Sequence, residues 1–286
     1  DEIFYIYVVD DENILKGRLA LKKMILSPTS TKIQSIYNPD VTYVTTDEPA
    51  ESVGRIMQKY DLVAIPVVDS IGRLVGRITI DDVVDVIREE AEKDYQMMSG
   101  ISQDVESSDT IWDQTKARLP WLIIGLLGGM LAAYMISFYE ADIALFPATA
   151  MFIPVITAMG GNVGIQSSAI VVKGLASNTL TSKNILQSIS KEISCAVINA
   201  CICSSIIFIL SLCFNLTSLA MPITVTISLF IVIMFASMFG TAFPLLLNKL
   251  KIDPALATGP FITLTNDIIG LNIYLFTGKA ILGWLL

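Results

Sequence analysis

Five long apolar segments fill the second part of the chain, and each is long enough to cross a lipid bilayer. A bilayer core of about 30 Å needs roughly 20 predominantly apolar residues in a helix. We place the segments at about Leu119–Phe138, Ala144–Val172, Ile193–Phe214, Met221–Leu247 and Ala255–Leu285. Because the backbone polar groups of a membrane segment must be satisfied internally, residues 119–286 are predicted to form an all-α transmembrane domain of five helices.

The basic residues around these segments predict their orientation. Bases gather at the ends expected to face one side, at Lys116, Arg118, Lys173, Lys183, Lys191, Lys249 and Lys251. The loops expected on the other side, Tyr139–Ile143 and Asn215–Ala220, contain no base. Since cytoplasmic loops carry an excess of Lys and Arg, we expect the N-terminal part in the cytoplasm, the C-terminus outside, and the protein in the cell (inner) membrane.

The part of the chain before Leu119 is charged and acidic. It holds 22 acidic and 13 basic residues, whereas the remainder holds 5 acidic and 6 basic residues. An acidic soluble part disfavours nucleic acid as a partner and favours cations. The chain has no histidine, and its 4 cysteines lie in one apolar segment without zinc-type spacing. Oxygen ligands and a hard ion such as Mg²⁺, Ca²⁺ or Mn²⁺ are therefore expected, and no enzyme motif is found.

The acidic part contains a repeat with an offset of 59 residues. Tyr7–Asp10 aligns with Pro66–Asp69, and Gly17–Leu19 aligns with Gly76–Ile78. Each copy predicts a strand, an acidic turn, a second strand and a helix, with the first strand at Ile3–Val9. The first copy opens abruptly, so we expect the first half of its unit to be absent from this sequence.

The second copy belongs to a complete α/β unit. It predicts strands at Val41–Val44, Leu62–Val68 and Leu74–Ile80, a helix at Ala50–Lys59 with Asp47 as its N-cap, and a helix from Ile80 to about Ala91. The pair resembles a CBS-domain tandem, a regulatory module. The resemblance implies a nucleotide site, with ATP as ligand, at Thr79 and Asp82. A scaffold that only mediates dimerisation is the alternative.

The helix that leaves the second unit carries a stripe of acidic residues. Asp82, Asp85, Glu89 and Glu92 are spaced three and four apart, so they share one helical face. Two interpretations stay open. The stripe is either a solvated face partly compensated by Arg88 and Lys93, or a divalent-cation site. We expect residues 1–86 to form the CBS pair with an incomplete first repeat, 87–118 to form a connecting helix region, and polar residues 95–113 to contain one or two helices.

Asp267 lies in the middle of the last apolar segment. An acidic residue at the centre of a membrane helix costs roughly 2.5–3.5 kcal/mol on insertion scales, so it is expected to face a cavity, a partner or an ion. At helical spacing, Gly259, Thr263, Asp267, Gly270 and Tyr274 form one stripe. This stripe is a candidate lining for a cation path.

The second apolar segment is the other unusual one. It contains Pro154 and the run from Gly160 to Ser168, Gly-Gly-Asn-Val-Gly-Ile-Gln-Ser-Ser. Its polar side chains must face protein or water, and its small residues also permit close helix contact. Both a lining role and a packing role are consistent with the pattern.

These two segments resemble the MgtE family of magnesium transporters, and the resemblance covers essentially the whole chain. It rests on Pro154, the Gly160–Ser167 run, Lys251–Ala255, and Gly259–Phe261 before Asp267. It implies a homodimer with the ion path on the dimer axis, where two copies of Asp267 would surround one ion. The implied pore residues are Asp267, Thr263, Gly259 and Asn162.

The same resemblance implies a set of regulatory metal ligands in the acidic part. They are Glu51, Asp61, Asp82, Asp85, Glu90 and Asp94, together with Asp253 at the junction of membrane and cytosol. The function implied is a magnesium-selective channel or transporter for Mg²⁺ influx that closes when cytosolic Mg²⁺ binds these acidic faces. The alternatives are transport of another divalent cation (Co²⁺, Ni²⁺ or Mn²⁺) and a membrane-anchored CBS nucleotide sensor without transport.

Overall fold

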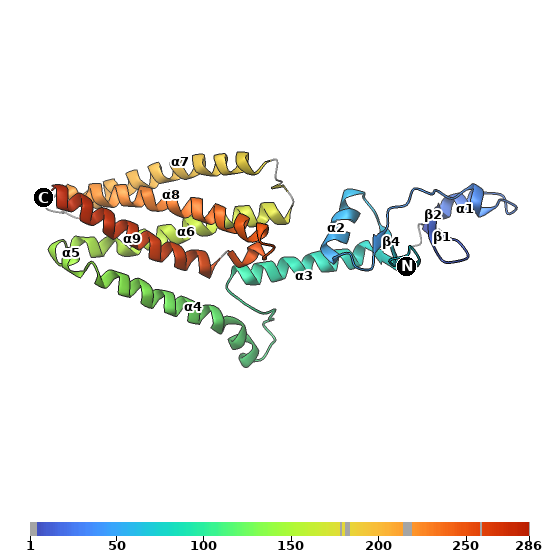
Figure 1. Cartoon of the computed structure of the whole chain (residues 1–286), viewed down its shortest axis with the longest axis horizontal. Helices are drawn as coiled ribbons and strands as arrows, with labels where there is room; N and C mark the ends of the chain where they lie inside the picture. The colour runs from blue at the N-terminus through green and yellow to red at the C-terminus, as the bar shows by residue number, and fades with distance from the viewer. Residues whose placement is uncertain (1–4, 178, 181–183, 214–218, 258, 286) are drawn as a thin grey trace. The chain divides into compact units, whose positions relative to one another are not determined.

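The chain is described by a computed structural model that covers residues 5–177, 179–180, 184–213, 219–257 and 259–285 (Figure 1). It forms two compact units, Asp1–Glu92 and Lys93–Leu286. The first contains sheets and helices and the second is helical, which confirms the predicted fold class. The domain limits proposed at residues 86 and 118 remain predictions.

The first unit contains two antiparallel hairpins, each followed by a helix. These elements are β1 (Tyr5–Val9), β2 (Leu15–Ala20) and α1 (Leu21–Leu26), then β4 (Ala64–Val68), β5 (Leu74–Thr79) and α3 (Ile80–Met98). Val8 pairs with Gly17 and Val67 pairs with Gly76, and both hairpins have a bulge immediately afterwards. The predicted repeat is therefore confirmed pair by pair. Ile3 and Phe4 of the predicted first strand lie outside the described residues.

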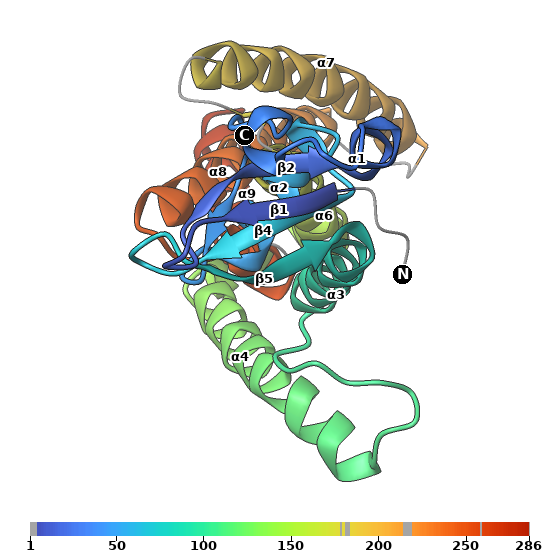
Figure 2. The same ribbon diagram turned by 90° about the vertical axis from the view of Figure 1, so that its right-hand side faces the viewer.

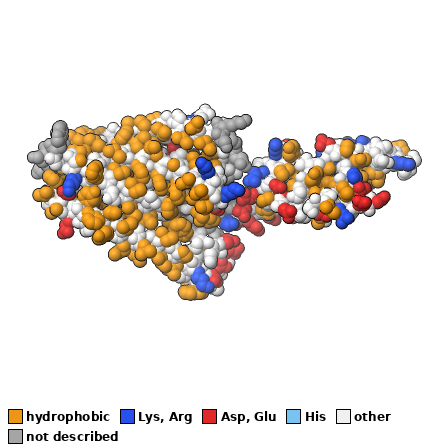
Figure 3. Space-filling model, in the orientation of Figure 1, with side chains coloured by type: hydrophobic (Ala, Val, Ile, Leu, Met, Phe, Trp, Pro, Cys, Tyr) orange, Lys and Arg blue, Asp and Glu red, His pale blue; other side chains and the backbone are white. Residues whose placement is uncertain are grey.

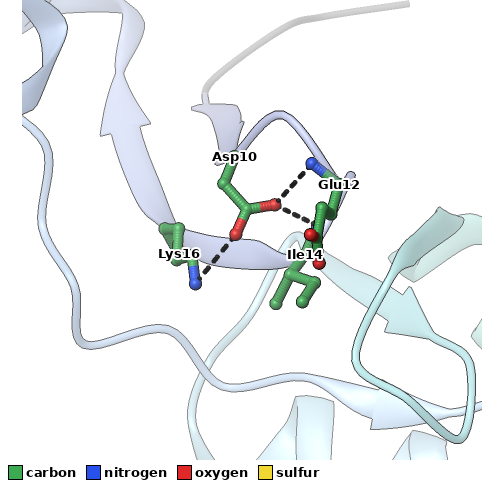
Figure 4. A network of polar contacts seen from close by, with 4 residues as sticks. All are labelled: Asp10, Glu12, Ile14 and Lys16. Atoms are coloured by element: carbon green, nitrogen blue, oxygen red, sulfur yellow. Dashed lines mark hydrogen bonds and ion pairs between the residues drawn. The ribbon is translucent and has the colours of Figure 1, made fainter.

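Asp10 holds the turn of the first hairpin together (Figure 4). Its Oδ1 accepts hydrogen bonds from the backbone N–H groups of Glu12 at 3.0 Å and Ile14 at 2.9 Å. Its Oδ2 lies 3.0 Å from Nζ of Lys16. The hydrogen bond from Lys16, followed by those from the backbone, holds the pKa of the Asp10 carboxyl below its usual value.

Asp69 performs the same role in the second hairpin. Its Oδ1 accepts from the backbone N–H groups of Ile71 at 3.1 Å and Arg73 at 2.8 Å. The two turns also bind each other, because Leu15 N donates to Gly72 O at 3.0 Å and Leu74 N donates to Asn13 O at 2.9 Å. These reciprocal bonds relate the two copies by an approximate two-fold axis.

The second copy is completed by β3 (Val44–Thr45), which pairs in parallel with β4, and by α2 (Ala50–Lys59). A short helix, η1 (Ile33–Ser35), precedes them. The core of this copy contains Val44, Val53, Met57, Ile65 and Val83.

The predicted N-cap at Asp47 is wrong. Pro49 is the N-cap residue of α2 and has no side-chain cap bond. The backbone N–H groups of Ser52 and Val53 donate instead to the Pro49 carbonyl. The helix therefore starts too far along the chain for the Asp47 side chain to cap it.

The segment between α3 and α4 also differs from prediction. One or two helices were predicted within 95–113; the end of α3 and the start of α4 enter this range, but residues 99–110 contain no helix. Gln96 holds this loop, since its Nε2 donates to Asp104 Oδ1 at 3.0 Å and its Oε1 accepts from Val105 N at 3.2 Å. Hydrogen bonds from the Gln96 side chain thus hold residues 104 and 105 in a loop conformation.

The second unit is a helical bundle. Its elements are α4 (Ile111–Ser137), α5 (Glu140–Leu145), α6 (Ala148–Ala176), α7 (Ile185–Leu212), α8 (Ala220–Lys249), η2 (Pro254–Ala257) and α9 (Pro260–Leu285). Within this unit α4 and α7 lie at opposite edges, with α6, α8 and α9 between them (Figures 1 and 2). The core is formed mainly by α6, α8 and α9 and includes Ile156, Val225, Val232, Leu271 and Tyr274.

Four described helices are long and apolar enough to cross a membrane: α4, α6, α7 and α8. Hydrophobic side chains cover most of the bundle face shown in Figure 3, as expected for a surface in contact with lipid. The fifth predicted span corresponds to α9, a helix of 26 residues packed against α6 and α8. Its crossing of the membrane remains a prediction.

Candidate functional site

The start of α9 is fixed by Gly259. Its backbone has φ of +66°, a conformation that favours glycine. Its carbonyl accepts hydrogen bonds from Thr263 N and Thr263 Oγ1, both at 3.1 Å. The Gly259 carbonyl and the Thr263 hydroxyl, both predicted to line the ion path, are therefore adjacent and are hydrogen-bonded to each other.

Asp267 lies one turn after Thr263 and faces α6. A Cβ placed on Gly161 would lie 3.6 Å from Asp267 Oδ1 and 3.3 Å from Thr263 Cγ2. Asp267 is half-buried, and no described residue forms a hydrogen bond or an ion pair with it. Asn162, the fourth predicted pore residue, is exposed on α6 next to Gly161. The structure thus brings Asp267 and Thr263 to the glycine-rich stretch of α6.

The C-terminal part of the predicted α9 stripe is packed inside the bundle. Tyr274 is fully buried, and its hydroxyl donates to the Thr149 carbonyl at 2.9 Å. Gly270 is also buried, and a Cβ there would lie 3.2 Å from Val232. These residues join α9 to α6 and α8, so only Asp267 and the residues before it remain candidates for a path.

Asn266 was missed by the sequence analysis. Its side chain is 1% exposed and lies against Gly160 and Gly164 of α6. Neither polar atom of its amide has a hydrogen-bond partner among the described residues. An unsatisfied buried amide is costly and calls for an explanation. The sequence did offer a signal for this residue: Asn266 is a polar residue next to Asp267, and α6 carries Gly160 and Gly164 four residues apart.

The predicted regulatory acids are spread over several elements. Glu51 on α2 pairs with Arg55 at 3.5 Å, and Asp61 follows α2 with φ of +49°. Glu51 and Asp61 are exposed. On α3, Asp82 and Asp85 are exposed, while Glu90 and Asp94 are half-buried. Asp253 Oδ1 accepts from Ala255 N at 2.8 Å. Within the described chain, no group of three or more acidic or cysteine residues forms a metal site.

Thr79 and Asp82 form a preorganised pair at the start of α3. The Thr79 hydroxyl donates to Asp82 Oδ2 at 2.6 Å, and Thr79 N donates to the same oxygen at 2.9 Å. The hydrogen bond from the Thr79 side chain, and then that from its backbone, lowers the pKa of the Asp82 carboxyl. An ionised acceptor beside a hydroxyl suits a ligand that offers hydroxyl groups.

Within the second unit, the end of α3 touches the start of α9. A Cβ on Gly259 would overlap the Met98 carbonyl, and one on Gly100 would lie 2.6 Å from Pro260 Cγ. Gly100 also has a positive φ, of +78°. The chain leaving α3 therefore abuts the helix that carries Asp267.

A cavity of about 350 Å³ lies at the other end of the bundle, between α5, the start of α6 and the end of α9. Lys279 Nζ lies 3.0 Å from Asp142 Oδ2 beside it. The charge of Lys279 near the C-terminal end of α9 is thus compensated by an ion pair.

Both parts of the chain are similar to known proteins. A family model described as "MgtE: Divalent cation transporter" matches residues 153–277, and a CBS domain model matches residues 33–89. The Bacillus subtilis magnesium transporter MgtE is 35% identical over 96% of this chain and 60% of its own length. The Thermus thermophilus magnesium transporter MgtE is 34% identical over 99% of this chain and 63% of its own length.

The chain therefore spans about 60–63% of the length of these relatives. Among solved structures, the cytosolic domain of the Mg²⁺ channel MgtE in complex with ATP is 50% identical, with a TM-score of 0.29. That match covers 30% of this chain and 35% of the other.

Proposed function

We propose that this chain is a member of the MgtE family of divalent cation transporters and conducts Mg²⁺ into the cell as a homodimer in the membrane; its similarity to two magnesium transporters over 96% and 99% of its length supports this. The observation that carries the proposal is Asp267. It is a half-buried carboxylate on α9, without a partner among the described residues, opposite Gly161 of α6.

A pair of Asp267 residues across a dimer axis would supply two negative charges to one divalent ion. Mg²⁺ loses its water reluctantly and usually keeps several waters when bound. A site for it therefore needs a few oxygens that hold a hydrated ion, and the absence of a side chain at Gly161 leaves space beside the carboxylate. Thr263 and Asn162 would accept or donate hydrogen bonds to the water shell.

We propose that cytosolic Mg²⁺ closes this path. The N-terminal unit would lie in the cytoplasm and the C-terminus outside. Asp82 and Asp85 are exposed on one face of α3, so their mutual repulsion falls when a divalent ion binds. The chain after α3 abuts Gly259 and Pro260, which gives a change in α3 a direct mechanical connection to α9.

A nucleotide would act at the CBS part in this account. Thr79 and Asp82 are held together by a hydrogen bond of 2.6 Å, and the carboxylate is stabilised in its charged form. We propose that this pair binds the ribose hydroxyls of ATP.

Flux measurements with the full chain in liposomes test the transport proposal. Wild-type protein should transport Mg²⁺ in preference to Co²⁺, Ni²⁺, Mn²⁺ and Ca²⁺. Asp267→Asn should reduce Mg²⁺ flux at least roughly tenfold, since each 1.4 kcal/mol of lost ion stabilisation is a factor of ten. Glu140→Gln is the matched control, because it removes an exposed carboxylate from α5.

Three results would overturn parts of the proposal. Wild-type Mg²⁺ flux in Asp267→Asn would remove the assignment of Asp267. A higher flux of Co²⁺ or Mn²⁺ than of Mg²⁺ would identify a transporter of another divalent cation. Nucleotide binding without any cation flux would support a membrane-anchored sensor.

A further inference from the structure

Glu192 is the second acidic residue inside the long helices of the bundle. Among the described residues of α4 and α6–α9, only Glu192 and Asp267 are acidic beyond the first helical turn. Glu192 is half-buried on α7. It lies one residue before the apolar segment predicted at Ile193–Phe214. A partly buried carboxylate loses hydration and therefore needs partners in the protein.

The Glu192 carboxylate joins three helices. Its Oε1 accepts a hydrogen bond from Ser167 Oγ on α6 at 2.6 Å and another from Ser237 Oγ on α8 at 2.9 Å. The two serine oxygens are 3.2 Å apart. Ser167 is 3% exposed and Ser237 is 1% exposed. No described Lys or Arg forms an ion pair with Glu192, so hydroxyl donors alone hold it.

This junction lies beside a close approach of α6 and α8. Gly240 follows Ser237 by one turn, and a Cβ there would lie 2.5 Å from the Gly164 carbonyl oxygen. Gly164 precedes Ser167 by one turn and is covered on another side by Asn266 of α9. The Glu192 hydrogen bonds therefore fix α6 both along its axis and in rotation.

The same rotation determines which face of α6 meets Asp267. Gly161 and Ser167 are six residues apart, about 9 Å along the helix. If α6 turned, Gly161 would no longer face Asp267 and Thr263, which now lie within 3.6 Å of a Cβ built on Gly161. The width of the space beside the carboxylate would change.

We infer that Glu192 is a positioning residue for ion selection, which accepts hydrogen bonds from Ser167 and Ser237 and so keeps Gly161 of α6 opposite Asp267. The inference rests on the proposed transport function. It assigns no contact between Glu192 and the ion. The required property is a hydrogen-bond acceptor at residue 192 that holds α6 in place. Because Mg²⁺ requires a more exact coordination geometry than Ca²⁺, a displaced α6 should affect Mg²⁺ flux more than Ca²⁺ flux.

Two substitutions at Glu192 separate an acceptor from a charge. Glu192→Gln keeps an oxygen acceptor and removes the charge, whereas Glu192→Ala removes both. In liposomes, Glu192→Gln should keep the wild-type ratio of Mg²⁺ to Ca²⁺ flux. Glu192→Ala should lower that ratio about 2- to 30-fold, the range in which residues outside a ligand shell modulate coupling.

The serines provide the reciprocal test and a matched control. Ser167→Ala combined with Ser237→Ala should lower the flux ratio as Glu192→Ala does. Ser228→Ala should leave it unchanged, because Ser228 is a buried serine of α8 without a hydrogen-bond partner among the described residues. A flux ratio normalises for the amount of folded protein, so a variant that only folds less well does not change it.

A distance measurement tests the inference without ion flux. Spin labels at Ile170 on α6 and Phe276 on α9, both exposed, would report the separation of the two helices in a cysteine-free background. The distance distribution should broaden or shift in Glu192→Ala and stay as in wild type in Glu192→Gln and Ser228→Ala.

The outcomes distinguish this inference from the proposed function. Absent flux in wild type would overturn the transport proposal, while the distances would still decide the positioning role. Wild-type flux ratios and distances in Glu192→Ala would overturn the inference alone. Equal loss in Glu192→Gln and Glu192→Ala would also overturn it, because the charge would then be the required property.

Discussion

Replacing Gly240 with alanine should destabilise the bundle, whereas the same replacement at Gly125 should stabilise it. At Gly240 the added Cβ would lie 2.5 Å from the backbone oxygen of Gly164, and ordinary contacts begin at 3.4 Å. A backbone oxygen has no other rotamer, so α6 and α8 must separate by several tenths of an ångström. Gly125 on α4 has no atom within 4 Å of the same added group.

The magnitudes follow from two opposing effects. Overpacking a well-packed interface costs about 1–3 kcal/mol, and alanine is better than glycine in a helix by about 1 kcal/mol. Gly240→Ala should therefore lose about 1 kcal/mol net, whereas Gly125→Ala should gain up to about 1 kcal/mol. At about 2–4 °C per kcal/mol for a domain of this size, the two melting temperatures should differ by about 4–8 °C.

The assay is thermal unfolding of the full chain in detergent, followed by size-exclusion chromatography of the remaining folded protein. Gly125→Ala should melt above wild type and Gly240→Ala below it. Equal shifts of the same sign would refute the close approach of α6 and α8, because helix propensity would then account for both variants.

The remaining predictions concern the N-terminal unit. Neutralising Asp82, Asp85 and Glu90 together should leave a channel that high Mg²⁺ on the cytosolic side no longer inhibits; unchanged inhibition in liposome flux would exclude these residues as the sensor. Thr79→Ala should weaken ATP binding roughly tenfold, the loss expected for one hydrogen bond to a charged group, as measured by calorimetry, and equal affinity would separate the pair from nucleotide binding. Because the pKa of Asp10 is lowered in the folded protein, its contribution to stability is present above its unfolded pKa of about 3.9 and is lost as the pH falls through the folded pKa. Asp10→Asn should therefore melt below wild type at pH 6 and approach it as the pH falls below about 4, and a constant difference across this range would contradict the turn assignment.

The sequence was most informative where the chain repeats itself. The offset of 59 residues predicted two equivalent hairpins, and the pairs Val8–Gly17 and Val67–Gly76 have this spacing. The acidic turns were visible because Asp10 and Asp69 bind only the next few residues along the chain. Local hydrogen bonds of this kind are encoded within a short window.

Hydropathy located the bundle helices but not their ends. It marks the part of a helix that contacts lipid, whereas α4 begins at Ile111, in polar sequence, where Thr110 caps Asp113 N at 3.3 Å. Likewise α7 begins at Ile185, before its apolar part. The polar turns at the start of these helices are therefore invisible to hydropathy; in α4 the start is fixed by the Thr110 cap.

The candidate site was predictable only in part. Asp267 was identified because a charge in an apolar segment is costly by itself. Glu192 was not, since its partners Ser167 and Ser237 are 25 and 45 residues away along the chain. The burial of Asn266 depends likewise on glycines of another helix. Such contacts arise only when the helices have packed.

The most direct test is a structure of the protein in lipid nanodiscs at high Mg²⁺, compared with one in chelator, which also tests the proposed dimer. The account predicts density for one hydrated ion on the two-fold axis between the two Asp267 carboxylates, and its loss in chelator. Asp267 side chains that point into lipid, or that lie on opposite outer faces of the dimer with no ion between them, would contradict it.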